Sequence, residues 1–94
     1  MEKDWFKIKN GNGNINEYDY KDDIIFNGEF IKGKRNGKGK EYYNNGELKF
    51  EGEYLNGQRN GKGKEYDYFG KLEFEGEFLN GKYFGKEMNI NMII

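Results

Sequence analysis

The side chains available for chemistry in this chain are carboxylates, lysines and tyrosines. Its 94 residues include no Ser, Thr, Cys or His. Without them, neither a nucleophile–base pair nor a catalytic triad of the usual kind can be assembled. Acid–base chemistry by Asp, Glu, Lys or Tyr is left, and those residues are numerous because a segment containing them recurs. We therefore predict that the protein is not an enzyme.

The same absences bear on metals and cofactors. Zinc, copper and haem iron are ordinarily held by His or Cys, which this chain lacks. The acidic pair Asp22-Asp23 is short and lies beside a predicted strand, a position typical of solvated carboxylates. We predict no metal site and no cofactor.

Net charge and hydropathy narrow the class of partner. Sixteen Lys and Arg residues against seventeen Asp and Glu give a formal net charge of −1. No bulk field therefore draws the protein to nucleic acid, and direct nucleic-acid binding is not expected. No apolar run is long enough to cross a bilayer, and residues 1–6 lack a signal segment. We expect an intracellular, cytoplasmic protein.

One segment recurs at a constant interval and organises the chain. Phe26, Phe50 and Phe74 mark equivalent positions, and glycines follow each of them at the same offsets. Such an interval is typical of stacked-repeat proteins, in which each unit buries its apolar face against its neighbours. We predict one domain over residues 1–94, made of a degenerate N-terminal unit or cap (1–25), two repeats (26–49 and 50–73) and a third repeat with a C-terminal capping strand (74–94).

Each unit reads as a β-hairpin. In residues 48–54 apolar residues or glycine alternate strictly with charged ones, the pattern of a half-buried strand. Residues 56–61 are rich in Asn and Gly and predict a turn, after which the chain returns from Gly61. A second turn is predicted at 44–46 and at 68–70. The expected fold is all-β, with antiparallel hairpins stacked into one elongated, twisted sheet.

The glycines inside the strands are expected to lie beneath aromatic rings. The predicted pairing sets Tyr54 opposite Gly61 and Gly52 opposite Gly63, so that rings lie across bare backbone. Burying one aromatic side chain contributes roughly 2–3 kcal/mol. A strand glycine costs only about 0.5–1 kcal/mol. The aromatic residues are therefore predicted to form the core.

Charge is sorted by strand on the other face. The same pairing sets Glu53 beside Lys62 and Glu51 beside Lys64. Such solvated cross-strand pairs contribute little individually, but they help to fix the register.

These residues resemble the MORN repeat (membrane occupation and recognition nexus), whose unit reads approximately Tyr-Glu-Gly-x-x-x-x-Gly-x-x-x-Gly-x-Gly. Residues 26–42 and 50–66 match it closely, and 74–86 match until Glu87 replaces the second paired glycine. MORN arrays occur as protein-binding rods, as membrane-associated scaffolds and beside catalytic domains. The resemblance implies a non-enzymatic protein-binding module.

The unit here is one residue longer than the usual MORN unit. Strict alternation from Gly61 would point Tyr66 outward, whereas the family pattern places an aromatic residue inward. We predict a β-bulge near residues 40–41 and 64–65 that absorbs the extra residue and turns Tyr42 and Tyr66 inward.

The two ends depart from the repeat. Residues 11–13 echo the paired glycines, and 17–20 echo 65–68 with two residues inserted. Trp5, Phe6 and Ile8 would cap the first hairpin. At the other end, alternating apolar residues suggest an open edge strand, and such edges pair with other chains. A homodimer is therefore predicted through Met88, Ile90, Met92 and Ile94.

A partner-specific surface is expected among the positions that vary between units or that carry anchor residues such as Tyr and Arg. The candidates are Arg35, Tyr43, Arg59, Tyr66, Tyr68, Phe69 and Tyr83. If Met1 begins a complete chain, binding is its whole activity, and we expect a stand-alone regulator or inhibitor that docks on a larger protein. A phage-type or antitoxin-like inhibitor fits this description.

Two other functions stay open. A membrane or lipid-associated scaffold is less favoured, since each lysine-bearing strand is interleaved with an acidic one. An acidic mimic of nucleic acid could instead occupy the basic channel of a nuclease. Its row of carboxylates would be Glu51, Glu53, Glu73, Glu75 and Glu77.

Overall fold

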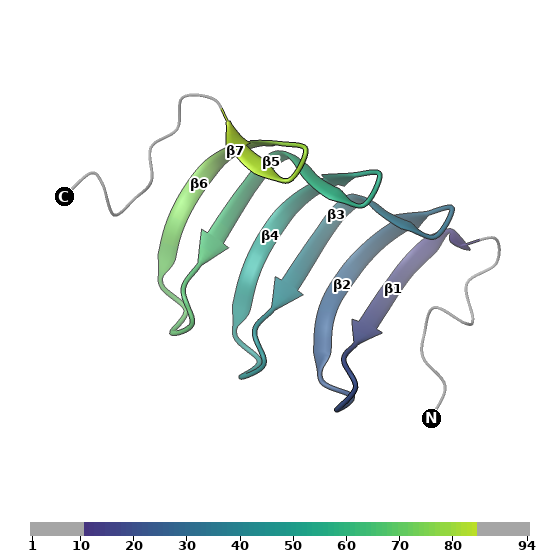
Figure 1. Cartoon of the computed structure of the whole chain (residues 1–94), viewed down its shortest axis with the longest axis horizontal. Coiled ribbons are helices and arrows are strands. Elements are labelled where there is room, and N and C mark those ends of the chain that lie inside the picture. Colours follow the sequence, from purple (N-terminus) through teal and green to yellow (C-terminus); the bar gives the residue numbers. More distant parts are fainter. Residues whose placement is uncertain (1–10, 85–94) are drawn as a thin grey trace.

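A computed structural model describes residues 11–84, which form one antiparallel sheet (Figure 1). Each strand is hydrogen-bonded to the next strand of the sequence, which confirms the all-β class and the stacked hairpins. The predicted N-terminal cap (Trp5, Phe6, Ile8) and the predicted edge strand (Met88, Ile90, Met92, Ile94) lie outside the described residues. The strands are β1 (Gly13–Tyr18), β2 (Ile24–Ile31), β3 (Lys34–Tyr42), β4 (Leu48–Leu55), β5 (Gln58–Tyr66), β6 (Leu72–Leu79) and β7 (Lys82–Phe84).

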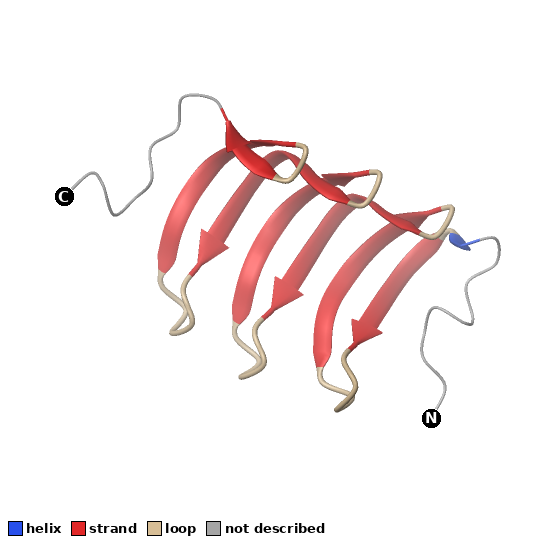
Figure 2. Ribbon diagram, in the orientation of Figure 1, coloured by secondary structure: helices blue, strands red, loops and turns tan. Residues whose placement is uncertain are grey.

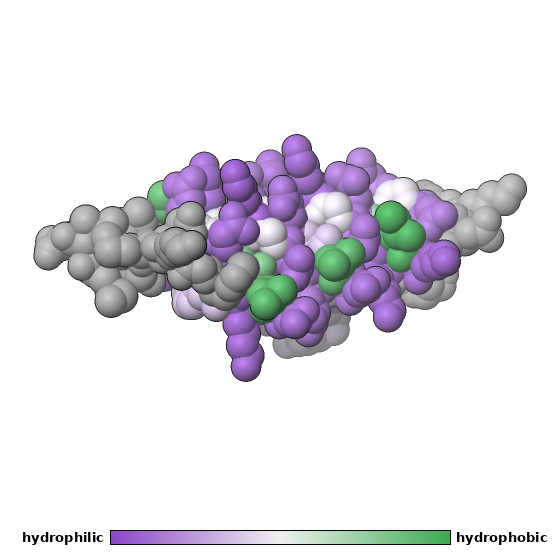
Figure 3. All heavy atoms as spheres, turned by 90° about the horizontal axis from the view of Figure 1, so that it is seen from above, coloured by the Kyte–Doolittle hydropathy of each residue, from purple (hydrophilic) through white to green (hydrophobic). Residues whose placement is uncertain are grey.

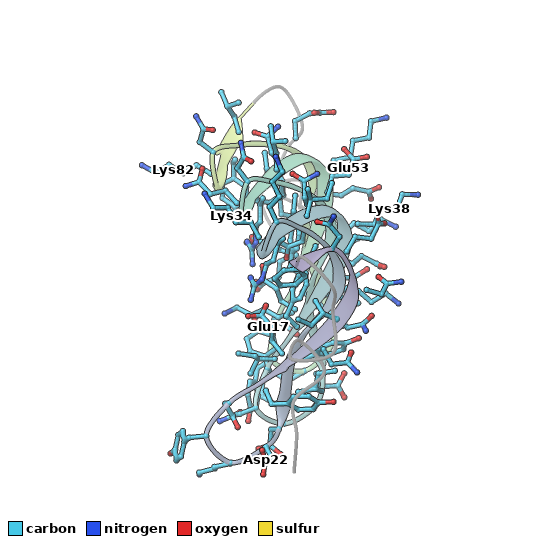
Figure 4. The ribbon with its side chains drawn as sticks, turned by 90° about the vertical axis from the view of Figure 1, so that its right-hand side faces the viewer. Glu17, Asp22, Lys34, Lys38, Glu53 and Lys82 are labelled. Atoms are coloured by element: carbon cyan, nitrogen blue, oxygen red, sulfur yellow. The ribbon has the colours of Figure 1, made fainter. Side chains whose placement is uncertain are left out.

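The sheet is bent along its strands and has two unlike faces. Figure 4 shows Lys38 and Glu53 on the convex side of the ribbon, here called the outer face, and Glu17 on the concave inner face. The core lies on the inner face, where seven apolar side chains are at most 8% exposed. They are Ile15, Phe26, Phe30, Phe50, Tyr54, Phe74 and Phe78.

The aromatic core residues form one continuous ladder along the stack. Phe50 meets Tyr54 of its own hairpin edge-to-face at a centroid distance of 5.7 Å, and Phe78 of the next hairpin at 5.2 Å. Phe26 repeats this arrangement with Phe30 at 5.7 Å and with Tyr54 at 5.2 Å. Edge-to-face pairs add about 0.5–1.5 kcal/mol each beyond the burial of their area. Neighbouring repeats are thus joined through their rings.

A row of glycines crosses five strands beneath this ladder. Gly52 pairs with Gly63 of the same hairpin, as predicted, and with Gly39 of the preceding one. Gly28 and Gly76 extend the row on either side. The rings rest directly on the row, since a Cβ atom added at Gly63 would lie 2.5 Å from ring atoms of Phe50.

The predicted partner of Tyr54 is wrong within the hairpin. Tyr54 pairs with Arg59 there, and it lies opposite a glycine only across the boundary to the preceding unit, where the partner is Gly37. The predicted six-residue turn is in fact a two-residue turn at Asn56-Gly57, whose φ angles are 51° and 89°. Positive φ at both residues is the mark of a tight type I′ hairpin. Residues 60–62 of the returning strand β5 form a bulge opposite Glu53.

This bulge also changes one predicted charge pair. Glu51 lies opposite Lys64, as predicted. Glu53 lies opposite Lys38 rather than Lys62, so that prediction is wrong. Glu53 instead binds the bulge itself, because its carboxylate accepts a hydrogen bond of 3.1 Å from the backbone N–H of Lys62.

The bulge predicted near residues 64–65 exists, but it does not turn Tyr66 inward. The register shifts between Glu65 and Tyr66, close to the predicted place, yet the extra residue is Glu73 on the facing strand β6. Alternation along β5 therefore continues unbroken. Glu65 lies opposite the inward-facing Phe74, while the Tyr66 hydroxyl donates a 3.0 Å hydrogen bond to Glu51 on the outer face.

The first strand is in phase with the repeats, so the predicted two-residue insertion is wrong. Gly13 pairs with Phe30 in the same way that Gly37 pairs with Tyr54, which makes Gly13 the equivalent of Gly37 without any insertion. Ile15 then stands where the later units have a glycine of the row, opposite Gly28. It is 4% exposed and belongs to the buried core.

The two-residue turns are held by the preceding unit. At the second turn, the Asn56 N–H donates to Asn36 Oδ1 (3.2 Å) and the Gly57 N–H donates to the Arg35 carbonyl (2.8 Å). The same two bonds recur at the turn of the unit before and at the turn of the unit after. These bonds connect adjacent units, so the turn geometry depends on stacking as well as on local sequence.

Candidate protein-binding surfaces

Three longer loops lie together at the end of the sheet opposite the two-residue turns (Figure 2). They span residues 19–23, 43–47 and 67–71. In the third, Asp67 Oδ1 accepts hydrogen bonds from the backbone N–H groups of Phe69 (2.9 Å) and Lys71 (2.8 Å). Side-chain acceptors of this kind fix a turn locally. The residue at the loop tip is therefore presented in one conformation.

The second and third loops bring together three of the predicted partner-binding residues. The rings of Tyr43 and Tyr68 meet at a centroid distance of 5.3 Å, and those of Tyr68 and Phe69 at 5.8 Å. Phe69 is 88% exposed and Tyr68 is 43% exposed. We call Tyr43, Tyr68 and Phe69 the loop patch.

Polar contacts hold the two tyrosines of the loop patch in place. The Tyr43 hydroxyl donates to the Tyr66 carbonyl (2.7 Å), and the Tyr68 hydroxyl donates to Asn44 Oδ1 (2.9 Å). The Asn45 side-chain amide donates to the Tyr68 carbonyl (2.9 Å). Burial raises the pKa of Tyr43, and nearby carboxylates raise it further, so the ring stays uncharged. The patch is an apolar surface on a rigid support.

A second arrangement, the inner ladder, runs along the concave face. It consists of alternating carboxylates and guanidinium groups: Glu17, Arg35, Glu41, Arg59 and Glu65. Arg35 Nε lies 2.8 Å from Glu17, and Arg59 Nε lies 3.1 Å from Glu41. Arg35 Nη1 also lies 3.9 Å from Glu41, and Arg59 Nη1 lies 2.5 Å from Glu65.

The two arginines of the inner ladder also cover the core. The Arg35 guanidinium carbon lies 4.0 Å from the ring centroid of Phe26, and that of Arg59 lies 4.0 Å from Phe50. In the third unit Tyr83 takes the equivalent place, with its ring 4.2 Å from that of Phe74. Three predicted partner-binding residues therefore shield the aromatic ladder. The arginines are largely enclosed, whereas Tyr83 is 52% exposed.

The carboxylate of Glu41 is the most heavily bonded group of the inner ladder. It accepts hydrogen bonds from Arg59 and from the Tyr54 hydroxyl, and Arg35 lies 3.9 Å away. Burial alone would raise the pKa of Glu41. The hydrogen bonds from Arg59 and Tyr54 and the two positive charges outweigh burial and hold this pKa below the usual 4.5.

This depressed pKa predicts a specific loss of stability in acid. A carboxylate with a lowered folded-state pKa stabilises the protein above its unfolded pKa, near 4.5, and that stability is lost as the pH falls through the folded value. We expect urea unfolding at pH 7 and at pH 3 to show a smaller pH-dependent loss for Glu41→Gln than for the unmodified protein. The exposed outer-face variant Glu75→Gln serves as the control. Equal losses for Glu41→Gln and the unmodified protein would contradict the assignment.

The outer face carries the acidic candidates, interleaved with lysines. Two shallow hollows of about 380 and 420 Å³ lie over the glycine row between rows of charged side chains. Lys64 lies between Glu51 and Glu75, and Lys62 lies opposite Glu77. The predicted carboxylates Glu51, Glu53, Glu75 and Glu77 are thus each opposite a lysine, and Glu73 lies in the β6 bulge. No uninterrupted acidic row forms among them.

The two-residue turns carry a feature that the sequence reasoning missed. Ile31, Leu55 and Leu79 occupy the same position in three units and are 49%, 50% and 48% exposed. Figure 3 looks onto these turns and shows separate apolar groups in a row among hydrophilic ones. The recurrence of an aliphatic residue just before each turn was the signal available in the sequence.

Comparison with protein families settles the type of repeat. The model of the MORN repeat matches residues 26–47, 50–68 and 74–86, together more than half of the chain. The chain belongs to the MORN repeat family. No curated protein and no solved structure gave a significant match. MORN repeats are generally interaction modules for proteins or membranes rather than catalytic units.

The predicted partner-binding residues of this MORN-repeat chain lie in separate places on the sheet. Within residues 11–84, no helix has the length and apolar character needed to span a membrane. Of the predicted partner-binding residues, the structure gathers Tyr43, Tyr68 and Phe69 at the loop end and Arg35, Arg59 and Tyr83 on the inner face. Tyr66 touches the first group through its carbonyl and the outer face through its hydroxyl.

Proposed function

We propose that this MORN-repeat chain binds a larger protein through the loop patch and regulates or blocks it, in the manner of a phage-type or antitoxin-like inhibitor. The observation that carries the proposal is Phe69, which is 88% exposed at the tip of a loop that a hydrogen-bonded Asp67 holds in shape. An exposed aromatic ring with Tyr68 packed beside it is the composition typical of a binding hot spot.

The rigidity of the support favours tight binding. Ordering a loop or a side chain on binding costs roughly 0.5–1.5 kcal/mol for each immobilised group. Here Tyr68 already donates to Asn44 and its carbonyl accepts from Asn45, both from the neighbouring unit. The partner is expected to offer an apolar pocket that receives the ring of Phe69.

The other two functions are less well supported by the outer face. Membrane attraction by exposed lysines amounts to about 1 kcal/mol each near an anionic surface. On this sheet Lys38 lies opposite Glu53 and Lys62 opposite Glu77, so neighbouring carboxylates offset that attraction. The same alternation weakens an acidic imitation of a phosphate row.

The proposal predicts that one side chain decides the capture of the partner. The tagged chain is incubated with lysate of its native host, and retained proteins are identified by mass spectrometry. We expect Phe69→Ala to bind the retained partner at least tenfold more weakly in a titration, because an aromatic anchor contributes more than about 1.4 kcal/mol. Addition of the unmodified chain should also change the activity of that partner.

Tyr20→Ala is the matched control for this experiment. Tyr20 is 91% exposed and lies in the equivalent loop of the degenerate N-terminal unit, but no ring contact joins it to another described aromatic residue. It should leave the affinity nearly unchanged. Equal affinity of Phe69→Ala and the unmodified chain would place the binding site elsewhere.

A further inference from the structure

The row formed by Ile31, Leu55 and Leu79, here called the turn row, lies at the opposite end of the strands from the loop patch. These side chains belong to the outer face, since each follows an inward-facing core residue, as Leu55 follows Tyr54. Their exposed fractions agree within two percentage points. Three units therefore present the same aliphatic surface at regular intervals.

The surroundings of the turn row are positively charged. Residues 31–34, 55–58 and 79–82 contain Lys32, Lys34 and Lys82, all exposed, and no acidic residue. On the strand side, a carboxylate stands two residues before each member of the row: Glu29, Glu53 and Glu77. The first two accept hydrogen bonds from the backbone N–H groups of Lys38 (3.2 Å) and Lys62 (3.1 Å), and Glu77 lies opposite Lys62. The turn row is thus apolar at its centre and basic at its rim.

We propose that the turn row is a docking site for an amphipathic α-helix of a partner protein, with acidic residues flanking the apolar stripe of that helix. Adjacent strands are about 4.8 Å apart, so equivalent residues of successive units lie roughly 9.6 Å apart. Residues i and i+7 of an α-helix are separated by about 10.5 Å on the same side. Three apolar residues at i, i+7 and i+14 therefore match Ile31, Leu55 and Leu79.

The size of the turn row favours a slender ligand over a second copy of this chain. A standard protein–protein interface buries about 800 Å² on each partner. Three half-exposed aliphatic side chains offer far less than that, whereas one face of a helix of about 15 residues needs only such a narrow stripe. The lysines at the rim complement acidic residues on the flanks of that helix. This docking site is independent of the loop patch.

The test uses a synthetic 18-residue peptide with Leu at i, i+7 and i+14, Glu on both flanks and Ala elsewhere. Binding is followed by methyl and amide NMR shifts and by fluorescence anisotropy, at peptide concentrations up to about 1 mM. We expect the largest shifts at Ile31, Leu55 and Leu79. A peptide with Lys in place of each Glu should bind at least tenfold more weakly.

Two variants connect the peptide to the turn row. Leu55→Gln should weaken binding at least tenfold, with amide dispersion confirming that the sheet is folded. Lys32→Glu with Lys34→Glu should weaken the acidic peptide and strengthen the Lys-substituted one. Tyr20→Ala, at the other end of the strands, should leave the affinity unchanged. No partner is needed, so failure here is distinguishable from failure of the loop-patch proposal.

Three results would overturn the proposal. The first is the absence of peptide shifts at about 1 mM. The second is binding that is insensitive to Leu55→Gln, or shifts centred on the loops at 43–47 and 67–71. The third is broadening of the Ile31, Leu55 and Leu79 methyl signals by phosphatidylserine vesicles but not by the acidic peptide, which would assign the row to a lipid surface.

Discussion

Gly52→Ala is expected to destabilise the protein by about 3 kcal/mol or more. A Cβ atom at Gly52 would lie 2.5 Å from the carbonyl oxygen of Lys62 and 2.7 Å from the Cα of Gly63. Both atoms belong to the backbone of the paired strand, so neither can move without separating β4 from β5. The ring of Phe50, at 2.7 Å, closes the remaining direction. The added methyl group would therefore clash both with the paired strand β5 and with the aromatic core residue Phe50.

Gly46→Ala separates this clash from the general effect of replacing glycine. Gly46 has a φ of 89° in the second loop, and nothing lies within 4 Å of an added Cβ atom. Alanine there is expected to destabilise by only about 1–2 kcal/mol, through the left-handed backbone conformation. Urea unfolding of both variants, followed by circular dichroism and linear extrapolation, gives the comparison. A smaller loss for Gly52→Ala than for Gly46→Ala would contradict the tight glycine row.

The sequence predicted the parts of the fold that depend on alternation within one strand. The recurring phenylalanines and the glycines of the row lie on one face, and the pairing of Gly52 with Gly63 and of Glu51 with Lys64 is confirmed. Each of these follows from the period of two along a strand, which a single segment already displays. Alternation does not say where the chain turns.

The errors arose where contacts between units decide the local structure. Asn-Gly occurs twice in the second unit, at 56–57 and at 60–61, and either pair can form a tight turn. The first forms it, because Asn36 of the preceding unit accepts from the Asn56 N–H, while Asn60 accepts from the Asn80 N–H of the next turn. The bulge that results moves Glu53 opposite Lys38. These hydrogen bonds join different units, so the sequence of a single unit does not reveal them.

The candidate partner-binding residues differ in the same way: their exposure follows from one segment, whereas their contacts across hairpins do not. Tyr68 and Phe69 stand in a predicted turn, and turns are exposed, so their position at the surface follows from the sequence. The edge-to-face contact between Tyr43 and Tyr68 does not follow, since these residues lie far apart in the chain, on neighbouring hairpins. Arg59 is predicted as a partner-binding anchor because its position varies between units and Arg is common at hot spots. Its enclosure between Phe50 and two carboxylates depends on stacking and is visible only in the sheet.

Arg59→Ala is expected to destabilise the protein by about 2–3 kcal/mol. The variant removes the guanidinium that covers the ring of Phe50 and that joins Glu41 to Glu65. Glu41 then retains Tyr54 and the more distant Arg35, in a site where its carboxylate is only 16% exposed. A carboxylate left without its nearest cation in such a site is poorly solvated.

The third unit supplies a matched control for this loss. Tyr83 occupies the position of Arg59. Its ring contacts that of Phe74 in a tilted arrangement at a centroid distance of 4.2 Å, and its hydroxyl donates a hydrogen bond of 2.6 Å to Glu65. Arg59→Tyr should therefore keep a ring over Phe50 and a donor near Glu41, and it should lose no more than about half as much stability as Arg59→Ala. Urea unfolding at pH 7 measures both variants.

A double-mutant cycle assigns the remaining difference to the ion pair. If Arg59 stabilises chiefly through Glu41, the loss caused by Arg59→Ala should shrink by about 1 kcal/mol in a Glu41→Gln background. Losses close to zero for both Arg59→Ala and Arg59→Tyr would show that neither the cover over Phe50 nor the donor to Glu41 contributes. Arg59 would then be available as a partner contact, because a guanidinium that does not stabilise the sheet can leave it without penalty.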